Sequence, residues 1–308
     1  MIDVHVLREL RMAPGPAGAD LPAHLSAASG LVQHRGRLYV VADDELGLGV
    51  FELAGNAPGR WFALFDGVLP AGPAARKAAK PDLESLLLWP TADGGGELLA
   101  LGSGSAALRH RAVRVALEAS GEPQGAAQFI DLSALHGGLA AQFAQPNIEG
   151  AFIDGDDFCL LQRGHAGEPI NACVRYPLRA VDAWLRGAGT CPPISTIRRY
   201  ELGNLEGVPL CFTDATAQNS QPPAGSAVAE ATDDAVADGP CRGSAVGWVA
   251  PDGTLQGLRP LSLRVKAEGI AWVGAGAGAD APARLLLVTD GDDRGAPALL
   301  LCAPWPLA

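Results

Sequence analysis

The sequence predicts an all-β protein, a five-bladed β-propeller, from three observations. Gly and Pro are frequent, at 39 and 24 of the 308 residues, which indicates many turns and few long helices. A degenerate unit of short apolar strands occurs five times along the chain. The last unit lacks an outer strand, which the first residues of the chain can supply. Because no linker-like segment divides the chain, we expect one domain over residues 1–308.

Each unit begins with a polar or acidic residue, followed by a short apolar run, a turn rich in Gly or Asp, and a longer apolar run. The five starting residues are Ser29, Glu84, Glu149, Asp214 and Glu268. Consecutive starts are 55, 65, 65 and 54 residues apart, which leaves room for the four short strands and the turns of a propeller blade. The longer runs begin at residues 37, 97, 157, 225 and 284.

The fourth unit offers two starting points, because Glu206-Gly207 matches the other starts as well as Asp214 does. The distance to the following longer run separates the two candidates. That distance is 19 residues from Glu206 and 11 residues from Asp214, against 8 to 16 in the other units. The sequence therefore favours Asp214.

Two further strands are expected to complete each blade. Their positions are residues 49–53 and 60–67, 111–117 and 126–132, 171–178 and 195–202, and 244–250 and 255–261. The fifth unit has only residues 298–304 left, so residues 4–10 (VHVLREL) are predicted to close the last blade as its outer strand. Such closure removes an exposed sheet edge. Helical spacing predicts two short surface helices, at residues 133–143 and 176–187.

The chain is acidic, with 34 Asp and Glu against 23 Lys and Arg and a formal net charge of −11. Nucleic acid is not an expected partner, because its binding depends on Lys and Arg neutralising phosphates. No segment approaches the roughly 20 apolar residues of a membrane span, and the start MIDVHVLRELRM lacks the apolar core of a signal peptide. The six cysteines form no C-x-x-C pair, which is typical of a reduced protein. We therefore expect a cytoplasmic protein without a membrane partner.

In a propeller the innermost strand of each blade lines the central channel, so the five starting residues converge at one end of it. Acidic side chains in a partly dehydrated funnel repel one another unless cations, protons or a metal ion offset their charges. Ca²⁺ prefers oxygen ligands, and this ring supplies only oxygens. The ring therefore predicts a Ca²⁺ site. The alternative is a water-filled channel with internal ion pairs, in which Lys80 and Lys266 neutralise Glu84 and Glu268.

A second group of polar residues lies where the second strand of each unit ends, facing the same end of the channel. Its members are Asp43, Asp44, Ser103, Ser105, Gln162, Arg163, Asp233, Asp234, Asp290 and Asp292. Arg163 is a cation beside an acidic funnel, and its guanidinium is suited to hold an anionic substrate group. Arg109, His110 and Arg111 are candidates to add to this contact. Any single one of these residues also fits the simpler interpretation of a solvated loop residue.

The segments SGL, KPDLES, NIEG, FTDATA and KAEG, each followed by a strand with a polar end, resemble those of an uncharacterised bacterial β-propeller family of unknown function. More distantly, the pattern is similar to that of the five-bladed calcium-activated nucleotidases, the apyrases. That resemblance implies one Ca²⁺ in the channel, with a ring formed by Ser29, Glu84, Glu149, Asp214 and Glu268. Asp214 departs from it, because that family has a hydroxyl residue there, and the full set of phosphate-binding basic residues is missing. Phytase-like and esterase-like propellers are a further analogy, although a fold alone does not fix a function.

Two functions follow from this ring. The first is a Ca²⁺-dependent hydrolase of a phosphate or ester substrate bound at the channel mouth, with Glu149 or Glu84 as the base and Arg163 as the anion contact. The alternative is a propeller that binds a small-molecule ligand or a protein without catalysis, with a structural ion or none. A hydrolase needs an open ion beside a deep pocket, whereas a scaffold needs a closed ion shell, or none, and an apolar surface patch.

Overall fold

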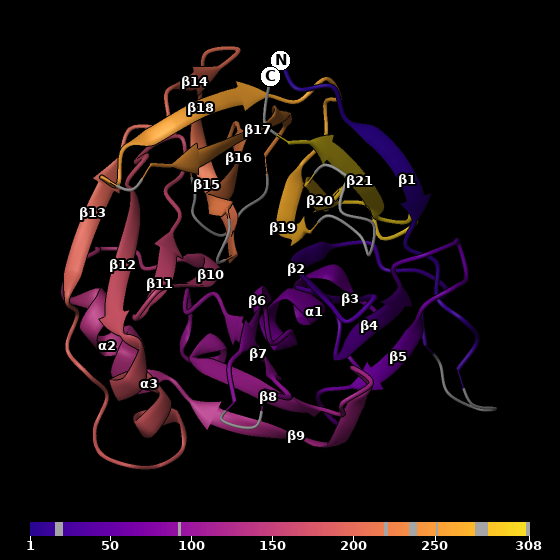
Figure 1. Cartoon of the computed structure of the whole chain (residues 1–308). Helices are drawn as coiled ribbons and strands as arrows, with labels where there is room; N and C mark the ends of the chain where they lie inside the picture. Colours follow the sequence, from indigo (N-terminus) through magenta and orange to yellow (C-terminus); the bar gives the residue numbers. More distant parts are fainter. Residues whose placement is uncertain are drawn as a thin grey trace.

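The computed structural model describes residues 1–15, 21–91, 94–218, 221–233, 239–250, 252–274 and 283–305. These residues form five antiparallel sheets that follow one another in a ring (Figure 1). The fold is therefore the predicted five-bladed β-propeller. Across these described ranges, no helix is both long and apolar enough to cross a membrane.

The first three blades each contain four consecutive strands, ordered from the channel outward. Blade 1 contains β2 (Ala28–His34), β3 (Arg37–Ala42), β4 (Gly47–Glu52) and β5 (Arg60–Ala63). Blade 2 contains β6 (Leu83–Trp89), β7 (Glu97–Gly102), β8 (Arg111–Leu117) and β9 (Pro123–Asp131). Blade 3 contains β10 (Ile148–Asp154), β11 (Asp157–Gln162), β12 (Asn171–Pro177) and β13 (Thr196–Tyr200).

The last two blades differ from this plan. Blade 4 contains β14 (Asn204–Leu205), β15 (Val208–Gln218), β16 (Gln221–Glu230), β17 (Cys241–Val249) and β18 (Leu255–Pro260). Blade 5 contains β19 (Ala267–Val273), β20 (Arg284–Thr289), β21 (Leu299–Pro304) and, as its outer strand, β1 (His5–Glu9). The antiparallel pairing of β1 with β21 confirms the predicted closure by the N-terminal strand.

The two predicted surface helices are present as α2 (Ser133–Ala140) and α3 (Leu178–Leu185). The sequence interpretation missed a third helix, α1 (Pro73–Ala79), and the short 3₁₀ helix η1 (Ala107–Arg109). Helix α1 has Pro in its first turn, where the missing N–H has no helical partner to lose. Figure 1 shows α1 near the centre of the ring, and it carries Lys77 to the channel mouth.

The core consists of five apolar clusters, one at each interface between neighbouring blades. Second strands such as β3 and β11 are buried along nearly their whole length, because both of their faces pack against adjacent blades. Their sequences are therefore continuous apolar runs rather than alternating ones. The five interfaces close the ring and hold the starts of the innermost strands close together.

A β-bulge interrupts every innermost strand where it enters the sheet. The pairing register shifts between residues 28 and 30, 83 and 85, 148 and 150, 212 and 214, and 267 and 270. The bulged residue is Ser29 in blade 1. In blade 4 it is Thr213, whereas the sequence predicts Asp214 at this position. The fourth start is thus displaced by one residue, while the rejected Glu206 lies in the β14–β15 turn with a φ of 51°.

Candidate functional site

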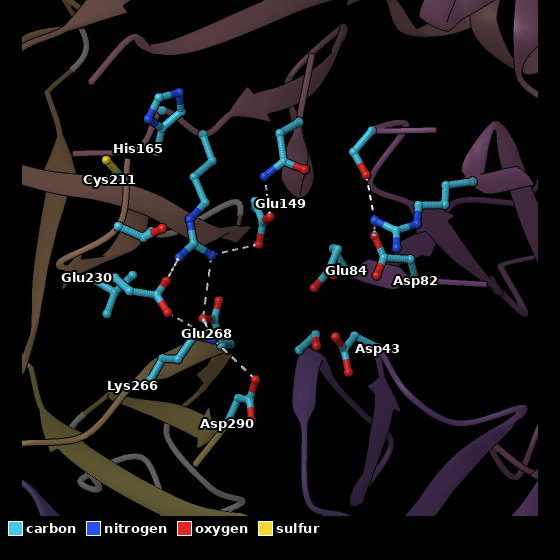
Figure 2. Close-up of a pocket in the computed structure, with 18 of the residues that line it drawn as sticks. Asp43, Asp82, Glu84, Glu149, His165, Cys211, Glu230, Lys266, Glu268 and Asp290 are labelled. Carbon is cyan, nitrogen blue, oxygen red and sulfur yellow. Dashed lines mark hydrogen bonds and ion pairs between the residues drawn. The ribbon is translucent and has the colours of Figure 1, made fainter. Parts of the chain in front are cut away.

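The starts of the innermost strands and the ends of the second strands enclose a pocket of about 70 Å³ at one mouth of the channel (Figure 2). A cavity needs roughly 10–15 Å³ for each water molecule, so this one accommodates a few waters or a small ion. The seven carboxyl groups that line it are those of Asp43, Asp82, Glu84, Glu149, Glu230, Glu268 and Asp290. The five Lys and Arg side chains that line it are those of Lys77, Lys80, Arg109, Arg163 and Lys266.

One side of the pocket holds a fully paired set of charges, which we call the Arg163 cluster. Its members are Glu149, Arg163, Glu230, Lys266, Glu268 and Asp290. The guanidinium of Arg163 lies 3.0 Å from Glu149 Oε2 and 2.7 Å from Glu230 Oε2. Lys266 Nζ lies 3.3 Å from Asp290 Oδ2. Every carboxyl group of this cluster therefore has a cation beside it.

The opposite side holds a smaller set, the Lys80 cluster of Asp43, Lys80, Asp82 and Arg109. Lys80 pairs with Asp43 and lies 2.9 Å from Asp82 Oδ1. Arg109 Nη1 lies 2.8 Å from Asp82 Oδ2, and the Ser103 hydroxyl donates a hydrogen bond to the same carboxylate. Asp82 has a φ of 57°, a left-handed conformation that is uncommon outside Gly. Such strain costs on the order of 1–3 kcal/mol and is typical of functional sites.

Glu84 lies between the two clusters and differs from both (Figure 2). No hydrogen bond or ion pair joins its carboxyl group to any residue that the structure describes. One of its oxygens lies within 4.8 Å of carboxylate oxygens from Asp43 and Asp82. Burial raises the pKa of Glu84 well above its usual range, and the nearby Glu149 raises it further. The Glu84 carboxyl group therefore takes up a proton more readily than an exposed glutamate does.

Two carboxyl groups of the clusters also hold protons tightly. Burial raises the pKa of Asp43 to about 7, although Lys80 opposes the shift. Burial raises the pKa of Glu268 to about 8 against the effect of Arg163 and Lys266. The common reason is that the lining has two more carboxyl groups than cations, and burial penalises charge that is left uncompensated. One divalent cation would offset that excess.

The structure brings together four of the five predicted ring residues and separates the fifth. Ser29, Glu84, Glu149 and Glu268 line the pocket. Asp214 does not line it, because its strand places it one residue beyond the bulge. There its Oδ2 accepts a hydrogen bond of 3.0 Å from the backbone N–H of Ile270. The carboxyl group of Asp214 thus contacts backbone instead of facing the pocket.

The second predicted group is only partly gathered. Its members in the pocket lining are Asp43, Ser105, Arg163 and Asp290. Asp44 instead pairs with Arg294 at 3.0 Å, and Gln162 accepts a hydrogen bond from the backbone of Asn147. Asp233 does not line the pocket, and Asp234 lies outside the described residues.

The three basic residues expected near Arg163 go to three different places. Arg109 lines the pocket as part of the Lys80 cluster. His110 stacks on the ring of His136, with 4.6 Å between ring centroids. Arg111 lies over the Phe65 ring, 5.9 Å from its centroid, and is absent from the pocket lining.

Sequence reasoning missed two acidic members of the site, Asp82 and Glu230. Asp82 stands two residues before Glu84 in the segment KPDLES, and its spacing alone could have drawn attention to it. Glu230 follows the apolar run GSAVA in the same way that Asp43 follows RLYVVA. The sequence interpretation extended that run as far as Asp233 and so passed over Glu230. In both cases a carboxyl group follows or precedes a buried strand at the same mouth of the channel.

Comparison with known proteins identifies a family and a fold. A profile described as a family of unknown function (DUF6929) matches residues 24–303. No curated protein matches this chain. An engineered GH43 glycoside hydrolase with endo-xylanase and exo-arabinofuranosidase activity is 10% identical, with a TM-score of 0.50 over 99% of this chain and 52% of the other.

Two further solved structures are similar to this chain at lower scores. A luciferin-regenerating enzyme is 8% identical, with a TM-score of 0.46 over 92% of each chain. A gluconolactonase from Xanthomonas campestris is 11% identical, with a TM-score of 0.40 over 91% of this chain and 72% of the other. At such identities, likeness extends to the fold and not to the activity.

Proposed function

We propose that this chain, which belongs to DUF6929, a family of unknown function, is a Ca²⁺-binding hydrolase. Because the family description gives no activity, the proposal rests on the residues of the pocket. The substrate would be a small phosphate or carboxylic ester whose head group enters the charged pocket at the channel mouth. The observation that carries the proposal is the half-buried carboxyl group of Glu84, which forms no ion pair with any residue that the structure describes and lies in a pocket with surplus acid.

The residues around Glu84 fit a hard cation. Ca²⁺ takes carboxylate, hydroxyl and water oxygens as ligands. Glu84 offers both of its oxygens, and the Ser29 hydroxyl donates to the carbonyl of Ala27 at 3.2 Å, so its lone pairs are free to coordinate. Glu149 and Glu268 would complete the set from blades 3 and 5, sharing their carboxylates with Arg163. Asp214 is not part of this set.

A bound Ca²⁺ would polarise the substrate oxygen that it contacts and offset charge developing there. Glu149 is the candidate base, since Asn147 and Arg163 hold its two oxygens at 2.7 and 3.0 Å and fix its orientation at the pocket wall. Three carboxylates surround Arg163. Its guanidinium is therefore better suited to neutralise these acids than to bind a substrate anion. Arg109 and Lys80 are the better candidates for the anion contact on the opposite wall.

The first test is metal binding. Chelator-treated protein is titrated with Ca²⁺, with Mg²⁺ as a second ion, while thermal unfolding and proton release are followed. At a free Ca²⁺ concentration of about 100 times Kd, the stabilisation should reach about 2.7 kcal/mol. Protons should leave the pocket on binding, because the pKa values of Glu84 and Glu268 are raised in the metal-free protein and a bound cation would lower them. Glu84→Gln should remove both responses, and the exposed Glu201→Gln is the matched control.

The second test is hydrolysis, with p-nitrophenyl phosphate and p-nitrophenyl acetate as substrates. Ca²⁺-dependent turnover of either one, lost in Glu149→Gln, supports the hydrolase. Ca²⁺ binding without turnover of any ester would leave a ligand-binding propeller with a structural ion. Absence of any response to Ca²⁺, with no bound metal by elemental analysis, would refute the ion site itself.

A further inference from the structure

A single layer of residues divides the central channel into two cavities. The charged pocket lies on one side of this layer. On the other side is a cavity of about 310 Å³, lined by the later parts of all five innermost strands from Leu31, Leu86, Ala151, Ala215 and Ile270 onward. The layer itself consists of Gly30, Ser85, Gly150, Asp214 and Gly269.

Four members of the layer are small because the strands approach one another closely there. A Cβ atom added to Gly30 would lie 2.7 Å from the backbone nitrogen of Leu86, and one added to Gly150 would lie 2.8 Å from the Cα of Asp214. Such distances are shorter than real Cβ contacts. Asp214 therefore contributes the only carboxyl group in a layer that otherwise has no side chain longer than that of Ser85.

Asp214 uses that space to join strands that no backbone hydrogen bonds join. Strands β10 and β19 are edge strands of their sheets, and β15 pairs with β14 only at Val208 and Pro209, so none of the three has a ladder partner on its inner edge at this layer. Asp214, in β15, is 1% exposed, and its Oδ2 accepts the N–H of Ile270 in β19 at 3.0 Å. On the other side Asp214 packs against Gly150 of β10, where an added Cβ would lie 3.1 Å from Asp214 Oδ1, an oxygen without a hydrogen-bond partner.

The two strands that Asp214 contacts, β19 and β10, carry two acids of the Arg163 cluster. Ile270 is two residues beyond Glu268 in β19, and Ala151 is two residues beyond Glu149 in β10. Glu149 and Glu268 lie 3.0 and 3.6 Å from the same guanidinium nitrogen of Arg163. The distance between β10 and β19 thus decides whether both carboxylates reach that nitrogen.

We propose that Asp214 is a positioning residue, which ties β19 to β15 by its hydrogen bond to Ile270 and packs against Gly150 of β10, so that Glu149 and Glu268 meet on Arg163. This role goes beyond the proposed hydrolysis and does not require a metal ion. In this blade the bulged residue, Thr213, is neutral and bonded to Ser226 and the carbonyl of Ala267, and the carboxyl group stands on the next residue.

The test uses NMR of the full chain without metal or substrate, so its outcome is independent of the hydrolase proposal. Two signals are followed: amide exchange at Ile270, and the guanidinium N–H resonances of Arg163, assigned by their loss in Arg163→Lys. Asp214→Ser introduces the residue that blade 2 has in this layer. It should raise exchange at Ile270 about tenfold, the factor that corresponds to the loss of one hydrogen bond. The Arg163 resonances should broaden and shift with it.

Asp214→Asn keeps the shape and one acceptor oxygen, so it should give smaller changes of both signals in the same direction. Ser85→Gly is the matched control, because the Ser85 hydroxyl is buried in the same layer without a hydrogen-bond partner. It should leave both signals unchanged. If Asp214→Ser does not fold, the Asn variant decides. Faster exchange at Ile270 with unaltered Arg163 resonances would reduce Asp214 to a local structural role, and an equal effect of Ser85→Gly would overturn the proposal.

Discussion

The two sides of the charged pocket differ in how their carboxyl groups are paired with cations. In the Arg163 cluster, four carboxyl groups share the two cations Arg163 and Lys266. In the Lys80 cluster, two carboxyl groups share Lys80 and Arg109, yet the adjacent Glu84 has no cation within ion-pair distance. By number the excess of acid lies in the Arg163 cluster, whereas Glu84 differs in having no ion pair with any residue that the structure describes.

This difference separates structure from function within one pocket. A buried carboxylate with a fixed cation is held in one orientation, while removal of its partner leaves an uncompensated charge. A buried carboxyl group without a cation keeps its proton, or exchanges that proton for a metal ion, and is free to act. The four predictions that follow test this contrast, in order of decreasing effect.

The largest effect is expected on removing the shared cation. Arg163→Met leaves Glu149, Glu230 and Glu268 buried without their common partner, so the free energy of unfolding at pH 7.5 should fall by about 3–5 kcal/mol. Urea unfolding measures this change. The exposed Arg198→Met is the control, and a loss as small as that of the control would show that the cluster is solvated.

The second effect is a pH dependence with an unusual sign. The folded-state pKa values of Glu84, Asp43 and Glu268 are raised, so the folded protein binds more protons than the unfolded chain above pH 4.5. Stability of the metal-free protein should therefore fall as pH rises from 5, up to about pH 7 through Asp43 and up to about pH 8 through Glu268. The loss should be at most about 1.4 kcal/mol per unit for each of these two groups, and Glu84 should add to this loss. The slope should be shallower in Glu84→Gln. Equal slopes for both proteins would mean that Glu84 is ionised.

A third effect, of opposite sign, is expected behind the Lys80 cluster. His136 is buried with neither ring nitrogen hydrogen-bonded, and burial together with His110 lowers its pKa to about 4. The unfolded chain then binds more protons between pH 6.5 and 4, so stability should be lost as pH falls through that window, by about 1.4 kcal/mol per unit. Thermal unfolding of His136→Leu should lack this loss. Parallel pH curves for the variant and the native protein would contradict the assignment.

The smallest effect is expected for an ion pair on the surface. Arg264 and Glu206 form an ion pair with side chains 56% and 50% exposed. Because water screens such a pair, Arg264→Ala should cost less than about 1 kcal/mol in urea unfolding. A loss comparable to that of Arg163→Met would show that burial is not what distinguishes the two pairs.

The sequence predicted the ring of acids better than it predicted the partners of those acids. Four of the five starting residues reach the pocket, because a repeated unit places equivalent residues at equivalent points around the axis. Asp214 failed by one position, since a β-bulge changes register without any mark in the sequence, and Thr213 and Asp214 are equally plausible as starts. Helix α1 was missed because it is a single short insertion that no other unit repeats.

The sequence by itself determined the number of blades and their closure by the N-terminal strand. These depend on the spacing of apolar runs and on the need to pair every outer edge, both of which are readable along the chain. Only the tertiary structure decided which carboxyl groups have cations. Arg163 and Glu230 are 67 residues apart in sequence and 2.7 Å apart in space. The strength of a charge interaction depends on distance and burial, and neither exists until the five blades are packed.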